Sequence, residues 1–174
     1  MHSKKISTFY FAESKNNLYL NGVIIALLKS CHMSTVRNIL QIKGNTVYSV
    51  SPDSSVYDAL EELEEKNLGA LVVLENGKLI GVFTERDYAR KVILKGRSSK
   101  ETLVRDIMSS TPVFVNPDKT LDDCMQLMTD KFIRHLPVLE NNELVGVISI
   151  GDIVKYIIYD KDFIIENLEH YITG

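Results

Sequence analysis

The sequence lacks an excess of positive charge. Lys and Arg number 20 against 23 Asp and Glu, which gives a formal net charge of −3 and a pI near 5.8. Lys-rich runs and alternating aromatic and basic residues are also missing. Nucleic-acid-binding surfaces carry such basic patches. We therefore expect no nucleic acid partner, and any polyanion that binds must be small and held locally.

Cysteine is scarce too. Cys31 and Cys124 are the only two, too few for a disulfide framework or for a metal site of their own. Cys124 falls on the apolar face of an expected helix, where a small buried thiol is the simplest interpretation. Such cysteine usage suits a reducing compartment, so we expect a cytoplasmic protein.

No hydrophobic run is long enough to span a membrane. The longest candidate, residues 18–28, is interrupted by Asn21 and Gly22 and is too short for a bilayer. Lysines precede it, as in a signal peptide, but no small-x-small cleavage site follows. We interpret residues 1–33 as an N-terminal leader or extension, either dispensable or upstream of a true start at Met33.

Catalytic motifs are also absent. There is no Walker-type phosphate loop and no Gly-x-Ser-x-Gly elbow. The four histidines lack metal-ligand spacing with one another or with the cysteines: His2, His32, His135 and His170. Ser149, His135 and Asp152 could be drawn as a triad, but the repeated motif below already accounts for the Ser and the Asp. We predict no enzymatic activity, no catalytic residues and no metal site.

What the sequence does contain is an internal repeat. Residues 81–87 (GVFTERD) return 65 residues later as 146–152 (GVISIGD), both reading Gly-x-x-[Thr/Ser]-x-x-Asp. The same offset aligns residues 73–76 with 138–141. Upstream the offset becomes 68, because the first copy carries three extra residues between positions 41 and 46. A duplicated unit of roughly 60 residues therefore organises the chain.

Each copy shows the same series of expected elements. A short strand (47–50 in the first copy) is followed by a helix that begins at a capping residue, Ser55 or Thr120, and then by a hairpin. The hairpins turn at residues 76–77 (Asn-Gly) and 141–142 (Asn-Asn). Further helices are expected at 35–42, 85–94 and 151–159, and a separate one at 162–172, whose apolar Phe163, Ile164, Ile165 and Leu168 would cap the module or meet a partner.

The expected fold is α+β, with each copy running strand-helix-strand-strand-helix. One copy is too small to bury its sheet alone, so we expect the two to pack sheet to sheet with pseudo-two-fold symmetry. The domain boundaries that follow are a leader (1–33), a first domain (34–95), a linker (96–103), a second domain (104–159) and a C-terminal tail (160–174).

The duplicated pattern resembles a tandem pair of CBS domains, also called a Bateman module, over about residues 36–158. The doubled motif carries the resemblance, together with residues 84–88 (TERDY) and 134–138 (RHLPV). The chain is similar to small stand-alone members. This resemblance implies a regulatory sensor that binds an adenosine derivative between the repeats: AMP first, or ADP, ATP with Mg²⁺, S-adenosylmethionine or a dinucleotide. No tightly bound cofactor is expected.

The resemblance also implies roles for the motif residues. Asp87 and Asp152 would accept hydrogen bonds from ribose hydroxyls, while Thr84 and Ser149 would face the phosphate. A carboxylate can accept two hydroxyl donors, and a helix N-terminus favours a nearby phosphate. The alternative is that both Thr/Ser-x-x-Asp sequences simply cap helices. The two roles are compatible.

Cationic and strand-end residues complete the candidate site. A phosphate should settle where cations converge, which favours Arg86, Arg90, Arg134 and His135. The alternatives are a solvated helix face for the arginines and a hydrogen-bonded, half-buried ring for the histidine. By the resemblance, Thr46 and Thr111, which precede the first strand of each copy, would lie near the ligand. A slot for the adenine would be lined by Val47, Tyr48, Pro112 and Val113. The alternative is ordinary strand packing. The three extra residues leave open whether both clefts have the same shape.

Two functions of different classes remain. One is the nucleotide-responsive regulator; the other is a structural dimerisation or docking module with degenerate ligand sites. Retention of both aspartates favours the first. The resemblance further implies a homodimer formed through the CBS helices, and an unidentified regulated protein. Four apolar residues of the helix expected at 151–159 are candidates for the interface, although core packing explains them equally well: Ile153, Val154, Ile157 and Ile158.

Overall fold

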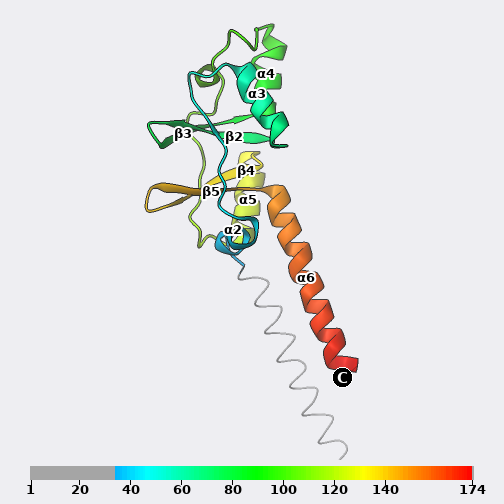
Figure 1. The fold of residues 1–174 in the computed structure, drawn as a ribbon. Helices are drawn as coiled ribbons and strands as arrows, with labels where there is room; N and C mark the ends of the chain where they lie inside the picture. The colour runs from blue at the N-terminus through cyan, green and yellow to red at the C-terminus, as the bar shows by residue number, and fades with distance from the viewer. Residues whose placement is uncertain (1–33, 174) are drawn as a thin grey trace, which may run out of the picture. The chain divides into compact units, whose positions relative to one another are not determined.

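A computed structural model describes residues 34–173 (Figure 1). Thr35–Ile153 form one compact unit, which holds both sequence repeats. The described residues from Val154 onward belong to a second unit, which we describe by itself. The predictions about the leader, about Cys31 and about a start at Met33 lie outside the described residues.

Two hairpins of matching register form the centre of the first unit. In the first, β2 (Ala70–Glu75) pairs antiparallel with β3 (Lys78–Thr84); in the second, β4 (His135–Glu140) pairs with β5 (Glu143–Ser149). Both ladders contain an irregularity at the same place, after Val73 and after Val138. β3 and β5 contact each other, which brings the two sheets together. The predicted pairing of like halves is confirmed.

The hairpin turns have the backbone that their residues predict. Asn76 and Gly77 have φ angles of 52° and 76°, and Asn141 and Asn142 have 51° and 66°. Two-residue turns of this kind need positive φ at both positions, and Asn and Gly adopt it at the lowest cost. In the second copy, Asn142 therefore adopts the positive φ that Gly77 adopts in the first.

The first helix after the opening strand buries the same face in both copies. α3 (Val56–Glu65) begins at Ser55, whose hydroxyl accepts from the Asp58 amide at 3.1 Å, and α5 (Leu121–Lys131) begins at Thr120, which accepts from the Asp123 amide at 3.2 Å. Figure 1 shows α3 beside the β2–β3 hairpin and α5 beside β4–β5. The buried positions match in spacing: Val56, Ala59 and Leu63, and Leu121, Cys124 and Met128.

The helices that follow the hairpins differ in length. α4 (Glu85–Lys91) stops early and continues as a short 3₁₀ turn, η1 (Ile93–Lys95), whereas α6 (Ile150–Thr173) runs without a break. The prediction of two helices at 151–159 and 162–172 was wrong, because no Gly or Pro lies between them to end the first. Within the described residues, no helix is long and apolar enough to cross a membrane.

The opening strand is shorter than the predicted 47–50 and forms only in the first copy. β1 (Ser49–Val50) pairs parallel with β2, but its counterpart is reduced to one bridge, Val115 with Val138. The expected strand of the second copy is therefore largely missing. Pro137 explains the difference: it stands 65 residues after Val72, whose amide donates to Tyr48, and proline has no amide proton to donate.

The segment that begins each copy packs against the other copy. α2 (Val36–Lys43), which starts the first repeat, donates from its Val36 amide to the Lys119 carbonyl at 3.0 Å. The corresponding 3₁₀ turn of the second repeat, η2 (Val104–Asp106), donates from its Val104 amide to the Ser54 carbonyl at 3.0 Å. The two halves have therefore exchanged their N-terminal segments.

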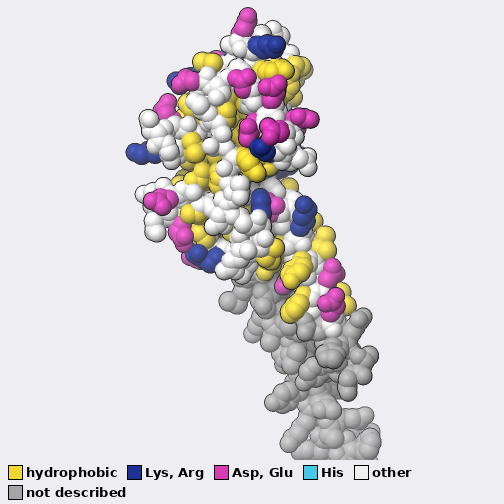
Figure 2. Space-filling view, viewed as in Figure 1, with side chains coloured by type: hydrophobic (Ala, Val, Ile, Leu, Met, Phe, Trp, Pro, Cys, Tyr) yellow, Lys and Arg dark blue, Asp and Glu magenta, His cyan; other side chains and the backbone are white. Residues whose placement is uncertain are grey.

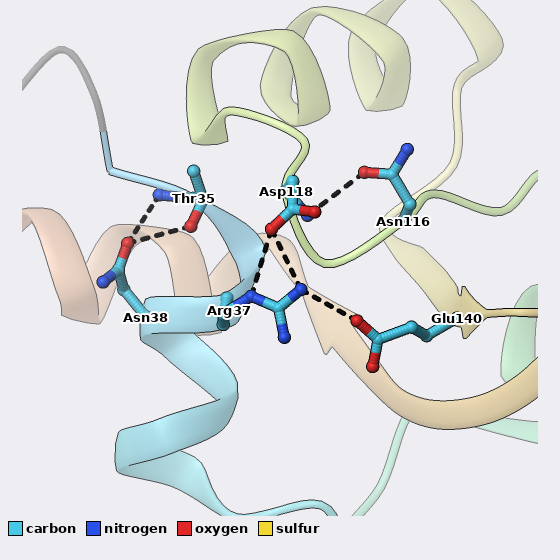
Figure 3. Close-up of polar contacts among 6 residues, drawn as sticks. All are labelled: Thr35, Arg37, Asn38, Asn116, Asp118 and Glu140. Carbon is cyan, nitrogen blue, oxygen red and sulfur yellow. Dashed lines mark hydrogen bonds and ion pairs between the residues drawn. The ribbon is translucent and has the colours of Figure 1, made fainter.

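An arginine fixes each exchanged segment. Arg37 donates through Nε and Nη2 to Asp118 at 3.0 and 2.9 Å, and through Nη2 to Glu140 at 2.8 Å (Figure 3). In the other half, Arg105 pairs with Asp53 and lies 3.8 Å from Glu75. The arginine, the aspartate and the glutamate of one contact correspond to those of the other through the repeat offsets. Each arginine therefore pairs with acids of the opposite repeat.

The core of the first half crosses the sequence repeat. Val104 and Ile107 belong by sequence to the second copy, yet they are 0% and 1% exposed within the cluster formed by the first. Each half is thus completed by residues from the other. The cluster consists of Val56, Ala59, Leu63, Leu71, Val73, Phe83, Val92, Val104 and Ile107.

Candidate functional site

The first copy of the repeated motif lies where β3 passes into α4. Thr84 has extended backbone (φ −135°, ψ 157°) and its hydroxyl accepts from the Asp87 amide at 3.2 Å. In return, Asp87 Oδ2 accepts from the Thr84 hydroxyl at 2.6 Å and from the Thr84 amide at 3.2 Å. The cap predicted as the alternative interpretation is therefore present, and it orients the carboxylate.

The second copy repeats this geometry between β5 and α6. Asp152 Oδ2 accepts from the Ser149 amide at 2.7 Å and from its hydroxyl at 2.8 Å, while the Asp152 amide donates back to that hydroxyl at 3.1 Å. Both carboxylates are mostly buried, with Asp87 14% and Asp152 18% exposed. The paired acids occupy equivalent positions in the two halves.

A cleft of about 410 Å³ opens beside the first motif. Its lining comes from both repeats, so a molecule inside would contact both halves of the unit. Nine of the sequence-predicted residues border it: Thr84, Arg86, Asp87, Arg90, Thr111, Pro112, Val113, Arg134 and His135. It is completed by Gly69, Val82, Ser109, Lys131, Phe132 and Ile133.

Cations dominate the charge of this cleft. Arg86, Arg90, Lys131 and Arg134 line it, whereas Asp87 is the one carboxylate among the described residues of its lining. Asp87 is already paired with Lys91 of its own helix, Oδ1 to Nζ at 2.8 Å. The side chains of Arg90 and Arg134 make no hydrogen bond or ion pair with the described part of the chain. Two unpaired guanidinium groups facing one hollow favour an anionic ligand.

Comparison with known proteins gives the family. The model of the CBS domain matches residues 37–93 and 104–159. The chain belongs to the CBS-domain family. It is 39% identical over 150 residues to the mitochondrial CBS domain-containing protein CBSX3 of Arabidopsis thaliana, covering 81% of this chain and 73% of that protein. It is 36% identical to the CBS domain-containing protein YhcV of Bacillus subtilis over 121 residues, 70% of this chain and 84% of the relative.

Solved structures agree with the fold. A CBS-domain protein of Burkholderia ambifaria, described as a candidate signal-transduction protein, superposes with a TM-score of 0.71 at 48% identity. The match covers 73% of this chain and 96% of that one. The predicted tandem CBS pair with an α+β fold is confirmed.

His135 of the CBS pair lies against Gly69. A Cβ built on Gly69 would lie 3.3 Å from His135 Cε1, so any larger residue there would require the ring to shift by a few tenths of an ångström. Burial lowers the pKa of His135, and the charge of Arg134 lowers it further, while Asp152 acts in the opposite direction. The ring is therefore neutral at pH 7, and it would gain a proton more readily beside a bound phosphate.

Four predicted residues do not border this cleft. Ser149 and Asp152 lie at the equivalent position in the other half, and Thr46 and Val47 precede β1. Thr46 is exposed and Val47 is partly buried. The structure therefore gathers the predicted residues into two unequal groups, nine around one cleft and four elsewhere.

The sequence prediction missed the end of α5. Lys131, Phe132 and Ile133 border the cleft, and Arg86 Nη1 donates to the Phe132 carbonyl at 2.6 Å. Phe132 ends the helix in the left-handed conformation, with φ 54°. A signal was available, since these residues directly precede the predicted Arg134 and His135. Within the described residues, no group of three or more His, Cys, Asp and Glu could hold a metal ion.

Proposed function

We propose that this CBS pair is a regulatory sensor that binds an adenine nucleotide, AMP in preference, in the cleft beside Thr84 and Asp87. The single observation that carries the proposal is the cleft itself. It places an oriented, mostly buried carboxylate and the unpaired guanidinium groups of Arg90 and Arg134 in one wall, to which both repeats contribute. A nucleoside monophosphate has the matching chemistry, with vicinal hydroxyl donors at one end and a dianion at the other.

Each end of the nucleotide has a partner in this arrangement. The Asp87 carboxylate accepts from the ribose hydroxyls, which charge-assisted hydrogen bonds favour. Arg90 and Arg134 receive the phosphate, and the apolar side chains of Pro112 and Val113 flank the base. If ATP is the ligand, Mg²⁺ would arrive on the triphosphate. No tightly bound cofactor and no catalytic step are part of the proposal.

Regulation follows from the position of the ligand between the repeats. A nucleotide that contacts both halves stabilises one relative arrangement of them. Coupling of about 1–3 kcal/mol is typical when such a change alters the binding of a second partner. That partner would be the regulated protein. The cytoplasmic location stays a prediction, and the name of the Arabidopsis relative places that protein in mitochondria.

A second role, dimerisation, is favoured by the surface of α6. Figure 2 shows hydrophobic side chains exposed along this helix beside acidic ones. Val154 and Ile158 are 47% and 55% exposed, whereas Ile153 is fully buried in the core. We propose that Val154 and Ile158 contribute to a homodimer, without Ile153; the molecular mass in solution tests this. Phe163 and Ile165 are also exposed, and the side chains of Ile164 and Leu168 lie outside the described residues.

The nucleotide proposal is tested by thermal unfolding with AMP, ADP, ATP, S-adenosylmethionine and NADH. A ligand at a hundred times its Kd adds about 2.7 kcal/mol of stability, and about 2–4 °C in Tm accompanies each kcal/mol in a domain of this size. We expect the largest shift with AMP and its loss in Asp87→Asn. Asparagine keeps the cap, because Asn38 already serves in the capping box of α2, but it loses the charge.

The matched control is Asp122→Asn, an exposed acid in the first turn of α5. It should keep the full shift with AMP. The proposal is wrong if no adenine compound raises the Tm, or if Asp87→Asn and Asp122→Asn respond to AMP alike.

A further inference from the structure

The second motif carries a contact that the first does not. Lys43, the last residue of α2, donates from Nζ to Asp152 Oδ2 at 2.8 Å and to the Val147 carbonyl at 3.0 Å. Asp152 thus receives an ammonium from another element of the chain, in addition to its bonds with Ser149. Burial raises the pKa of Asp152, but the hydrogen bonds from Lys43 and Ser149 outweigh burial and hold the pKa below its ordinary value.

The equivalent position in the first half is filled differently. Val82 stands 65 residues before Val147, and its carbonyl accepts from the Ser109 amide at 2.9 Å. Val82 and Ser109 both border the cleft beside Asp87. Lys43 Nζ therefore donates to the Val147 carbonyl where the first half uses the Ser109 amide. Unlike that amide, the ammonium carries a full positive charge.

In the first half, Asp87 pairs with a lysine of its own helix, Lys91. Lys91 lies one turn along α4 from Asp87 and does not border the cleft; its Nζ also donates to the Ile107 carbonyl at 2.6 Å. Asp87 can therefore keep its lysine while a ligand enters. Four residues after Asp152, where Lys91 follows Asp87 in the first half, the residue is Tyr156, and the ion pair of Asp152 is formed with Lys43. Its cation comes from the exchanged segment instead.

The repeat offsets show where this lysine originates. The first copy carries three extra residues between positions 41 and 46, and α2 extends into them to end at Lys43. Its counterpart in the second copy, η2, is a three-residue turn that is followed by the pairing of Ser109 with Val82. The three-residue insertion of the first copy thus contains or adjoins Lys43, whose ammonium donates to Asp152.

We propose that Lys43 is a built-in occupant of the second site, so that the CBS pair binds one nucleotide and not two. The ammonium pairs with the Asp152 oxygen that would otherwise accept from ribose hydroxyls, and it also donates to the Val147 carbonyl beside it. This inference rests on the proposed function of the first cleft. It assigns the two aspartates different roles: Asp87 serves the ligand, and Asp152 anchors α2.

Titration calorimetry with AMP tests the stoichiometry. The wild type should bind one AMP per chain, and Lys43→Met should bind two. Lys43→Met combined with Asp87→Asn should bind one, at the second site alone, while Asp87→Asn by itself should bind none. The control is Lys119→Met, which breaks an exposed lysine–aspartate pair of 3.1 Å elsewhere on the unit and should leave the value at one. Two AMP per wild-type chain, or one per Lys43→Met chain, overturns the proposal.

A ligand-free measurement separates this inference from the proposed function. The pKa of Asp152, followed by NMR of its carboxyl carbon, should rise in Lys43→Met and stay unchanged in Lys119→Met. If no variant binds AMP, the proposed function fails, and this titration alone decides whether Lys43 holds Asp152. If AMP binds through Asp87 but the Asp152 pKa does not move in Lys43→Met, the occupant role fails and the first site stands.

Discussion

The glycine that opens each motif marks a close approach between the two halves. A Cβ on Gly81 would lie 2.6 Å from Met108 Sδ and 2.9 Å from the Ser109 carbonyl oxygen. A Cβ on Gly146 would lie 2.6 Å from a methyl group of Leu40. Leu40 belongs to α2, and Met108 and Ser109 follow η2 closely in the chain. The absence of a side chain at Gly81 and Gly146 therefore allows the two halves to pack closely, whether or not a ligand is bound.

Alanine at these positions should act unequally. Gly81→Ala meets a backbone oxygen that cannot rotate away, so we expect a loss of about 1–3 kcal/mol in the free energy of unfolding, as for overpacked cores. Gly146→Ala meets the end of a leucine side chain and should cost less. Urea denaturation of both variants measures the difference. Equal losses would mean that the approach of Ser109 to Gly81 is not a tight contact.

His135 should make the ligand-free protein less stable in mild acid. Burial lowers its pKa in the folded state, so between that pKa and the ordinary value near 6.5 the unfolded chain binds more protons. The free energy of unfolding should therefore fall as the pH drops from about 7.5 to 5.5. His135→Gln should show a flatter dependence in the same denaturation series. An unchanged slope would mean that the ring titrates equally in both states.

At the scale of elements, much of the fold was predictable. The hairpins, their turns and the caps of α3 and α5 are local patterns, and each was present in the structure where the sequence indicated it. The reduced strand of the second copy was also readable, because Pro137 stands where an amide must donate. The break expected within α6 had no such local signal and was wrong.

The exchange of α2 and η2 could not be derived from local patterns. Periodicity shows that a segment has an apolar face but not which half of the molecule it covers. The matching Arg, Asp and Glu positions of the repeats were visible, yet their crossed pairing depends on the three-dimensional arrangement. For the same reason, the contact of Lys43 with Asp152 appeared only in the structure.

A core substitution tests the exchange. Ile107→Ala removes a residue that is 1% exposed in the core of the first half, although it belongs to the second repeat. We expect a loss of about 2–5 kcal/mol in chemical denaturation. The control is Leu94→Ala, since Leu94 is 76% exposed and surface changes usually stay within about 0.5 kcal/mol. If the two variants are equally stable, the segment formed by η2 and Ile107 does not complete the core.

At the scale of the whole unit, the sequence predicted two like halves with equivalent aspartates, and the structure contains both. The three extra residues of the first copy left open whether the two clefts have the same shape, and the structure shows that the surroundings of the two aspartates differ. Nine predicted residues meet around one cleft because β3, α4 and the segment before β4 converge there. The remaining four are separated from it by the symmetry of the pair. Duplication placed the two aspartates at equivalent positions, and the three extra residues between positions 41 and 46 changed what surrounds Asp152.

The crossed N-terminal segments also bear on how such a chain arises. A lone copy of the unit would expose the surface that α2 or η2 covers, and only a second polypeptide could supply the missing piece. Two separate chains would then fold in proportion to their concentration, as domain-swapped dimers do. Joining the copies through residues 96–103 converts that encounter into an intramolecular one. The fused protein can complete both cores however dilute it is.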